Sequence, residues 1–300
     1  MLDNNAKSIL KTLLYYDIFN YPLTLDEIAN YVSDESILAK SIEELKIQNL
    51  LLYNSPYYGL NNMEENVKRR TIANEFAAAI MPKAIKSAKV MAKFPFVQGV
   101  CISGSLSKKY FDEKSDVDFF IITKPNRLWL CRTLLMLYKK VFLFNSRKYF
   151  CANYFVSEEN LEIPDKNIFT AVEIATLLPV HNYELYKQFF NANNWIREYF
   201  PNSKEYSTEY IIDGNTLKSK KFTEYLLGSY LGELLDKLAF RVTIFYWKRK
   251  FKNFNEQEFD LHLRSRKNVS KHHPQGMQKK VIDLYSNKIA DFEKKGIVIS

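Results

Sequence analysis

Two short clusters of residues, between positions 103 and 118, have the types and spacing that phosphate chemistry requires. Gly104 lacks a Cβ, so a ligand can approach its backbone closely, and Ser105 follows where a helix would begin and expose N–H groups to phosphate oxygens. Asp116 and Asp118 are two residues apart, so on a strand both carboxylates share one face and can hold Mg²⁺ or Mn²⁺. The sequence therefore indicates metal-assisted phosphoryl transfer. The flanking hydroxyls are assigned to nucleotide binding as well: Ser103 and Ser115.

These residues need a scaffold, and the surrounding pattern predicts one. Apolar runs predict three strands, at residues 97–102, 117–123 and 148–156. Helical patterns lie between them, at residues 105–110 and 127–144. The elements in this order form a small α/β unit with a mixed sheet, of the α+β class. The Gly-Ser pair follows the first strand, and the two aspartates alternate on the second.

The whole pattern resembles the polymerase-β-like nucleotidyltransferase superfamily, in its minimal bacterial type. The motif consists of Gly104-Ser105, a ten-residue spacer and Ser115-Asp116-Val117-Asp118, and the surrounding topology extends the resemblance to residues 96–156. The resemblance implies that Gly104 and Ser105 hold a nucleoside triphosphate (NTP) and that Asp116 and Asp118 coordinate the metals. It also implies transfer of a nucleoside monophosphate with release of pyrophosphate.

The sequence departs from this family at the third acid. Active members usually carry one on a later strand, where it serves a metal or acts as a base. Here the alternation of the strand at 148–156 places Asn153 at that position, as the candidate third catalytic residue. An amide oxygen can ligate a metal, but asparagine cannot act as a base, and a buried amide bonded to neighbouring backbone is an equal alternative. Glu158 and Glu159 could replace the acid if the chain curls back.

Two functions of different kinds therefore stay open. The first is an Mg²⁺-dependent nucleotidyltransferase acting on an unknown acceptor, which could be a small molecule, a protein or a nucleic-acid end. The alternative is a catalytically impaired, nucleotide-binding regulatory protein that acts through its N-terminal module on DNA or a protein partner. A toxin–antitoxin component is a third alternative, although the length and the added domains count against it.

The N-terminal part, residues 1–62, predicts a winged-helix-like unit. Helical patterns at 6–16, 24–31 and 36–48 precede a hairpin at 50–60, and Thr24 with Glu27 forms a capping box. DNA binding by this unit is disfavoured, because the segment that would read the DNA, residues 34–48, carries four acids against two lysines. A helical linker is expected at 63–95, and its charges, Arg70 among them, predict a solvated face.

Two further domains complete the chain: the nucleotidyltransferase core at residues 96–164 and a helical domain at 165–300. Helices are predicted at 169–178, 183–199, 222–251 and 275–294. A basic loop at 264–280 has no acid and could close over the phosphates or the acceptor. Its candidate substrate contacts are Arg264, Arg266, Lys267 and Lys271, and Lys271 is assigned to nucleotide binding.

Composition sets the broad limits. A net charge of +9 favours an anionic partner without choosing one. The three cysteines, Cys101, Cys131 and Cys151, lie in apolar runs, which predicts buried core residues and a cytoplasmic protein without a disulfide framework. The N-terminal residues lack the layout of a signal peptide. Residues 128–144 are apolar at thirteen of seventeen positions, but three basic residues interrupt them, so we expect a buried helix and no membrane span.

Overall fold

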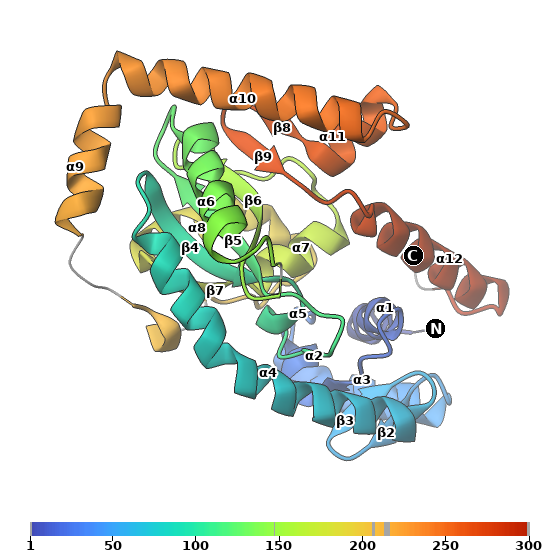
Figure 1. Ribbon diagram of the computed structural model, residues 1–300. Coiled ribbons are helices and arrows are strands. Elements are labelled where there is room, and N and C mark those ends of the chain that lie inside the picture. Colours follow the sequence, from blue (N-terminus) through green and yellow to red (C-terminus); the bar gives the residue numbers. More distant parts are fainter. Residues whose placement is uncertain (1, 147, 206–207, 213–216, 299–300) are drawn as a thin grey trace.

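The computed structural model describes residues 2–146, 148–205, 208–212 and 217–298. It is a mixed α/β fold, as predicted, with a small three-stranded sheet in the N-terminal unit and a six-stranded sheet in the core (Figure 1). Within these ranges, no helix combines the length and the apolar character that a membrane span needs.

The N-terminal unit contains the predicted helices and hairpin. The hairpin strands pair antiparallel, and a short third strand joins them in the order β1-β3-β2. The predicted capping box is confirmed, since the Thr24 hydroxyl accepts from the Glu27 N–H and the Glu27 carboxylate accepts from the Thr24 N–H. The elements are α1 (Asn4–Asp17), β1 (Leu23–Thr24), α2 (Leu25–Ala29), α3 (Leu38–Ile47), β2 (Leu52–Asn54) and β3 (Tyr57–Gly59).

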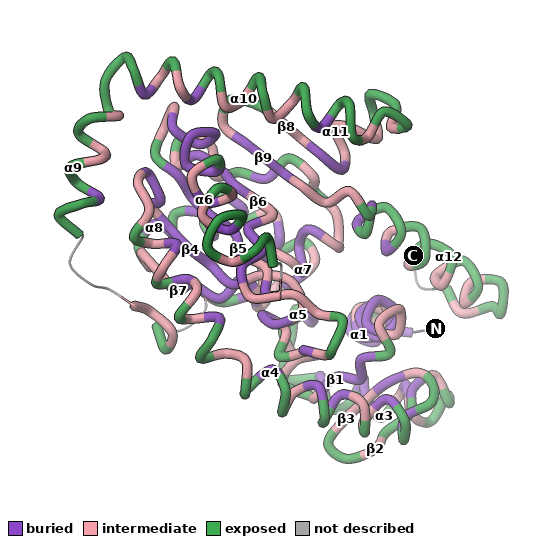
Figure 2. The backbone as a smooth tube through the Cα atoms, in the orientation of Figure 1, coloured by how far each residue is buried: buried purple, intermediate pink, exposed green. Residues whose placement is uncertain are grey.

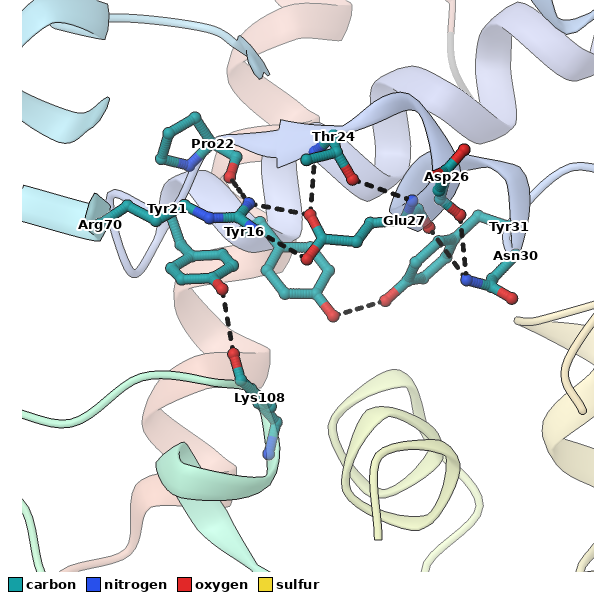
Figure 3. Close-up of polar contacts among 10 residues, drawn as sticks. All are labelled: Tyr16, Tyr21, Pro22, Thr24, Asp26, Glu27, Asn30, Tyr31, Arg70 and Lys108. Atoms are coloured by element: carbon teal, nitrogen blue, oxygen red, sulfur yellow. Dashed lines mark hydrogen bonds and ion pairs between the residues drawn. The ribbon is translucent and has the colours of Figure 1, made fainter. Parts of the chain in front are cut away.

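A single long helix, α4 (Met63–Ala92), leads from this unit to the core and continues through Pro82. Its solvated face does not include Arg70, which is 3% exposed. Arg70 donates to both carboxylate oxygens of Glu27, at 2.8 and 2.7 Å, and to the carbonyl of Pro22. Figure 3 shows this guanidinium lying between Pro22 and Glu27. The prediction for Arg70 was therefore wrong, because a charge with ideal partners can be buried.

The core sheet has the order β7-β4-β5-β6-β9-β8, and only its central pair, β5 and β6, is parallel. Three of its strands come from the region predicted to be wholly helical, and that prediction was wrong. β7 contains Pro179 and pairs only with β4, so it is an edge strand, where proline is tolerated. The strands are β4 (Val97–Ser103), β5 (Asp118–Thr123), β6 (Cys151–Ser157), β7 (Leu178–His181), β8 (Ser265–Arg266) and β9 (Val269–Lys271).

The helices of the core cover both faces of this sheet. Alternation along β5 sends Phe119 and Ile121 into a cluster with α4, α6 and Trp247 of α10, and sends Phe120 and Ile122 into one with α7 and α8. The second cluster continues into α1, α3 and α12, so the N-terminal unit shares the core of the sheet. The helices are α5 (Gly104–Ser107), α6 (Leu128–Phe142), α7 (Ile168–Ala175), α8 (Tyr183–Ala192), α9 (Lys218–Leu227), α10 (Tyr230–Lys250), α11 (Glu256–Leu263) and α12 (Met277–Lys294).

The helix predicted at 222–251 is interrupted, and its two parts, α9 and α10, meet at Gly228 and Ser229. The guanidinium of Arg127 stabilises the break, because it donates to the carbonyls of Leu227, Gly228 and Ser229. Figure 1 shows the resulting corner, after which α10 runs past α6, against which it packs. In Figure 2 much of α10 is exposed, while most of β4, β5 and β9 is buried.

Candidate active site

The turn between β4 and α5 brings the Gly-Ser pair against the second aspartate. Ser103 pairs with Asp118 in the antiparallel register of β4 and β5. Gly104 follows with φ +70°, and a Cβ at this position would lie 2.6 Å from Oδ2 of Asp118. Only glycine fits here, because it tolerates the left-handed region and leaves room for the carboxylate. The predicted helix at 105–110 is one turn long.

These residues line a cavity of about 790 Å³ that opens between the core, the N-terminal unit and α10. Seven of the eight predicted site residues lie on its wall: Ser103, Gly104, Ser105, Ser115, Asp116, Asp118 and Asn153. Residues of α1, α6, α7 and the segment before α12 complete the wall. The sequence motif and the third strand therefore meet in one place, as the spacing predicted.

Asp118 is the electrostatic centre of this site. Burial raises the pKa of its carboxyl to about 7, and the negative charges of Glu173 and Asp116 add to the rise. Nδ2 of Asn153 donates to Oδ1 of Asp118 at 2.6 Å. A buried carboxyl whose pKa is raised in part by neighbouring acids in a cavity is a functional-site signal, because a cation or a proton must offset the repulsion.

Asp116 reaches the cavity by a different route from the one predicted. The strand begins at Asp118, so Asp116 lies in the turn before it and does not share a strand face with Asp118. Asp112 shapes this turn, since its carboxylate accepts from the Lys114 N–H and from the Ser115 hydroxyl at 2.7 Å. The hydroxyl of Ser115 is thus also part of the turn that presents Asp116.

The structure separates the three candidates for the missing acid. Asn153 faces Asp118, as predicted, and its Oδ1 accepts from the Cys151 thiol at 3.1 Å. Glu158 and Glu159 follow the other end of β6, beyond the pair Thr123 and Ser157, and do not line the cavity. The chain does not curl back, so they do not take the place of the acid.

A different acid, Glu173 of α7, is present in the cavity wall. Its carboxylate forms an ion pair with Lys108 at 2.8 Å, and the Lys108 ammonium also donates to the carbonyl of Gly104. Sequence reasoning missed Glu173, although a single acid in the otherwise uncharged helix IFTAVEIA was a usable signal. Glu173 connects α7 to the Gly-Ser turn and increases the negative charge around Asp118.

The predicted substrate contacts of the segment at 264–280, Arg264, Arg266, Lys267 and Lys271, do not line the cavity. Lys271 lies in β9, is 3% exposed and does not line the cavity. Its ammonium lies 3.2 Å from the Asp165 carboxylate and donates to Oε1 of Gln278. Arg264 also pairs with Asp165, and Arg266 pairs with Asp260. These ion pairs stabilise the packing of β8 and β9. The residues that follow β9, His272 to Pro274, do line the cavity.

The cysteines are free and buried, as predicted, and Cys151 also lines the cavity beside Asn153. Among the residues that the structure describes, no group of three His, Cys, Asp or Glu side chains could hold a metal ion by itself.

The N-terminal unit forms one side of the cavity through Tyr15, Tyr16, Phe19 and Tyr21. The hydroxyl of Tyr21 donates to the carbonyl of Lys108 at 3.0 Å, which joins this unit to the turn that follows α5 (Figure 3). No protein-family model, curated protein or solved structure matches this chain.

Proposed function

We propose that this protein is an Mg²⁺-dependent nucleotidyltransferase that moves a nucleoside monophosphate from an NTP to an acceptor. The observation that carries the proposal is the packing of Gly104, at φ +70°, directly against the carboxylate of Asp118 on the wall of a large cavity. A backbone turn open to phosphates thus stands beside two acids. The turn can bind the phosphates of the NTP and the acids can bind a metal ion, which are the two requirements of metal-assisted nucleotidyl transfer.

The donor set fits a magnesium ion. Mg²⁺ prefers oxygen ligands and is commonly bound by one or two carboxylates together with substrate phosphates and water. Asp116 and Asp118 provide such carboxylates in one cavity, and the raised pKa of Asp118 indicates a position where positive charge is favourable. When bound, the ion would neutralise phosphate charge and polarise the reacting groups.

The other residues have supporting roles in this proposal. Ser103 and Ser105 offer hydroxyl donors to the phosphates, while Lys108 holds the Gly104 carbonyl in place. In the reaction, an acceptor oxygen forms a bond to the α-phosphorus as the bond to the bridging oxygen breaks. Pyrophosphate leaves, and the acceptor proton passes to a carboxylate of the site or to water. Asn153 orients Asp118 through its amide.

One observation favours the alternative, a nucleotide-binding regulatory protein. At the position of the third acid, an amide nitrogen and no carboxylate contacts Asp118. The bond from Tyr21 to Lys108 offers a route by which an occupied site would act on the N-terminal unit. In this alternative the NTP binds and is not turned over.

Labelled nucleotides distinguish the two functions. Each α-labelled NTP is incubated with the protein, Mg²⁺ or Mn²⁺ and a cell extract, and label transfer and pyrophosphate are measured. We expect transfer that falls about 100-fold or more in Asp118→Ala. Glu158→Gln is the matched control, because this acid lies off the cavity, and it should retain activity. NTP binding without transfer would support the regulatory protein, and absence of both would contradict both functions.

A further inference from the structure

Arg132 of α6 is a buried cation without an obvious structural partner. Its side chain is 8% exposed and lines the cavity, on the same helix face as Met136 and Lys140. Among the residues that the structure describes, its guanidinium has no hydrogen-bond or ion-pair partner. An arginine carries five donors, and burying them without acceptors is unfavourable, so such a group calls for a ligand.

Aromatic rings hold this guanidinium in place. It lies over the ring of Trp247 at 4.6 Å, and over those of Trp129 and Phe155 at 5.9 and 6.0 Å. Burial lowers the pKa of Arg132 to about 10, so the group stays charged at neutral pH. The rings fix the position of the charge and accept no hydrogen bonds from its planar edge, so an oxyanion could still take them.

Arg127, five residues earlier, shows how this fold treats a structural arginine. It is equally buried, at 7% exposure, but does not line the cavity. Its guanidinium donates to four backbone carbonyls, those of Asn126, Leu227, Gly228 and Ser229. The two arginines therefore differ in their hydrogen-bond acceptors. The guanidinium of Arg127 has acceptors from the protein, whereas that of Arg132 lines the cavity without any.

Other basic side chains line the same cavity as Arg132. Lys140 and Lys250 are exposed and line this cavity, and the ring of His272 lies tilted against that of Trp247, with 4.8 Å between the ring centroids. The acids of the cavity lie near one another, since Asp116 and Glu173 contribute to the raised pKa of Asp118 and Glu173 pairs with Lys108 just after α5. Asn153 stands between the two regions, because its side chain contacts Asp118 while its carbonyl accepts from the backbone N–H of His272.

We propose that Arg132, with Lys140 and Lys250, binds a phosphate group of the acceptor, so that the acceptor is a phosphorylated molecule. The inference rests on the proposed function, which assigns the NTP phosphates to Ser103, Gly104 and Ser105. The arginine fork fits a phosphate or a carboxylate, and the two lysines that line the same cavity favour the doubly charged phosphate.

Inorganic phosphate is the probe, with acetate as the carboxylate probe. The full chain is titrated with each at constant ionic strength and without metal, and tryptophan fluorescence is followed in a Trp195→Phe background. Trp129 and Trp247 then report directly on the arginine. We expect saturable quenching by phosphate, about 10- to 100-fold weaker binding in Arg132→Met and a smaller loss in Arg132→Lys.

Thermal unfolding separates a ligand-binding arginine from a structural one. Arg132→Met removes an unpaired buried charge, so its Tm should equal or exceed that of the unmodified chain, while the rise in Tm caused by phosphate is lost. Arg127→Lys should lower the Tm and keep the phosphate effect. Equal phosphate binding in Arg132→Met, or acetate binding as tight as phosphate, would overturn the proposal.

Two further arms keep the inference distinct from the proposed function. Asp118→Asn should abolish nucleotidyl transfer and leave phosphate binding unchanged, because Arg132 lies on another element. If metal-free ATP displaces phosphate competitively, Arg132 binds the nucleotide and the acceptor proposal is wrong. If transfer is observed but phosphate does not bind, the enzyme proposal stands and this inference falls.

Discussion

At the scale of single residues, Asp118 shows how position controls chemistry. An exposed aspartate ionises near pH 4, whereas burial, followed by Glu173 and Asp116, raises the pKa of this carboxyl to about 7. The amide of Asn153 donates to the carboxyl without neutralising it. Between these two pH values the folded protein therefore holds a proton on Asp118 that the unfolded chain releases, so this carboxyl contributes to the pH dependence of stability.

The sign of this dependence gives a test. Because the pKa is raised in the folded state, the contribution of Asp118 to stability is present below pH 3.8 and is lost as the pH rises to about 7. Asp118→Asn should therefore raise the free energy of unfolding at pH 8 by about 1–3 kcal/mol and have little effect at pH 4. Urea denaturation in EDTA between these pH values measures it.

Asp165 provides the control, because its pKa is shifted in the opposite direction from that of Asp118. Burial alone would raise the pKa of Asp165, but the charges of Lys271 and Arg264 outweigh it and lower the pKa. Asp165→Asn should therefore destabilise the protein at pH 8, by about 3–5 kcal/mol, because it leaves buried cations unpaired. If both variants shift stability in the same direction at pH 8, the assignment for Asp118 is wrong.

The sequence could identify residues whose role depends on local spacing. Gly104, Asp118 and Asn153 lie on consecutive strands or at their ends, so alternation and motif length were enough to bring them together. Glu173 and Arg132 come from helices, and only tertiary packing decides that these side chains face the cavity. The prediction that Lys271 contacts the nucleotide was wrong for the same reason. Its polar sequence neighbours indicated a loop, but pairing of β9 with β6 buries this side chain.

At the scale of elements, the β4–α5 turn determines the geometry of the site. Gly104→Ala would place a Cβ 2.6 Å from Asp118 Oδ2 in a backbone with φ +70°. We expect a loss of about 1–2 kcal/mol from the backbone alone, with a further loss from the clash. The displaced carboxylate should also weaken the rise in Tm that an NTP with Mg²⁺ produces.

Gly296 separates backbone strain from the clash. Its φ is +82°, and a Cβ there would meet nothing within 4 Å. Gly296→Ala should cost about 1 kcal/mol and leave the effect of NTP unchanged. An equal loss of stability in the two variants, with NTP binding intact in both, would show that the contact between Gly104 and Asp118 has no functional role.

Element prediction succeeded where a local signal exists and failed where pairing supplies the stability. The capping box of Thr24 and Glu27 marks α2 correctly, and the alternation at 117–123 gives β5. β7 and β9 are three or four residues long, and one contains proline while the other ends in lysine. Such segments have weak intrinsic preference and form strands because β4 and β6 offer free edges.

At the scale of the whole molecule, the N-terminal unit is built into the core. One buried cluster joins Ile9 and Leu13 of α1 to Phe189 of α8 and Val281 of α12. Asp17 pairs with Lys288 across the same boundary. Figure 1 shows α1 beside α12, although these helices come from opposite ends of the chain. A cavity wall made by this unit thus needs no flexible linker to reach the site.

A shared core predicts a single cooperative unfolding transition. Arg70→Met should shift that transition as a whole, by about 2–3 kcal/mol, because Glu27 loses its partner but is a third exposed. Lys46→Ala, in an exposed pair with Glu43, is the control and should change stability by less than about 1 kcal/mol. Calorimetry measures both changes in stability.

If the N-terminal unit were independent, Arg70→Met would instead divide the thermal unfolding into two transitions, an early one for residues 1–62 and an unchanged one for the core. A fragment of residues 63–300 would then fold alone, whereas a shared core predicts that it exposes apolar side chains of the cluster to which α1 belongs and does not fold cooperatively.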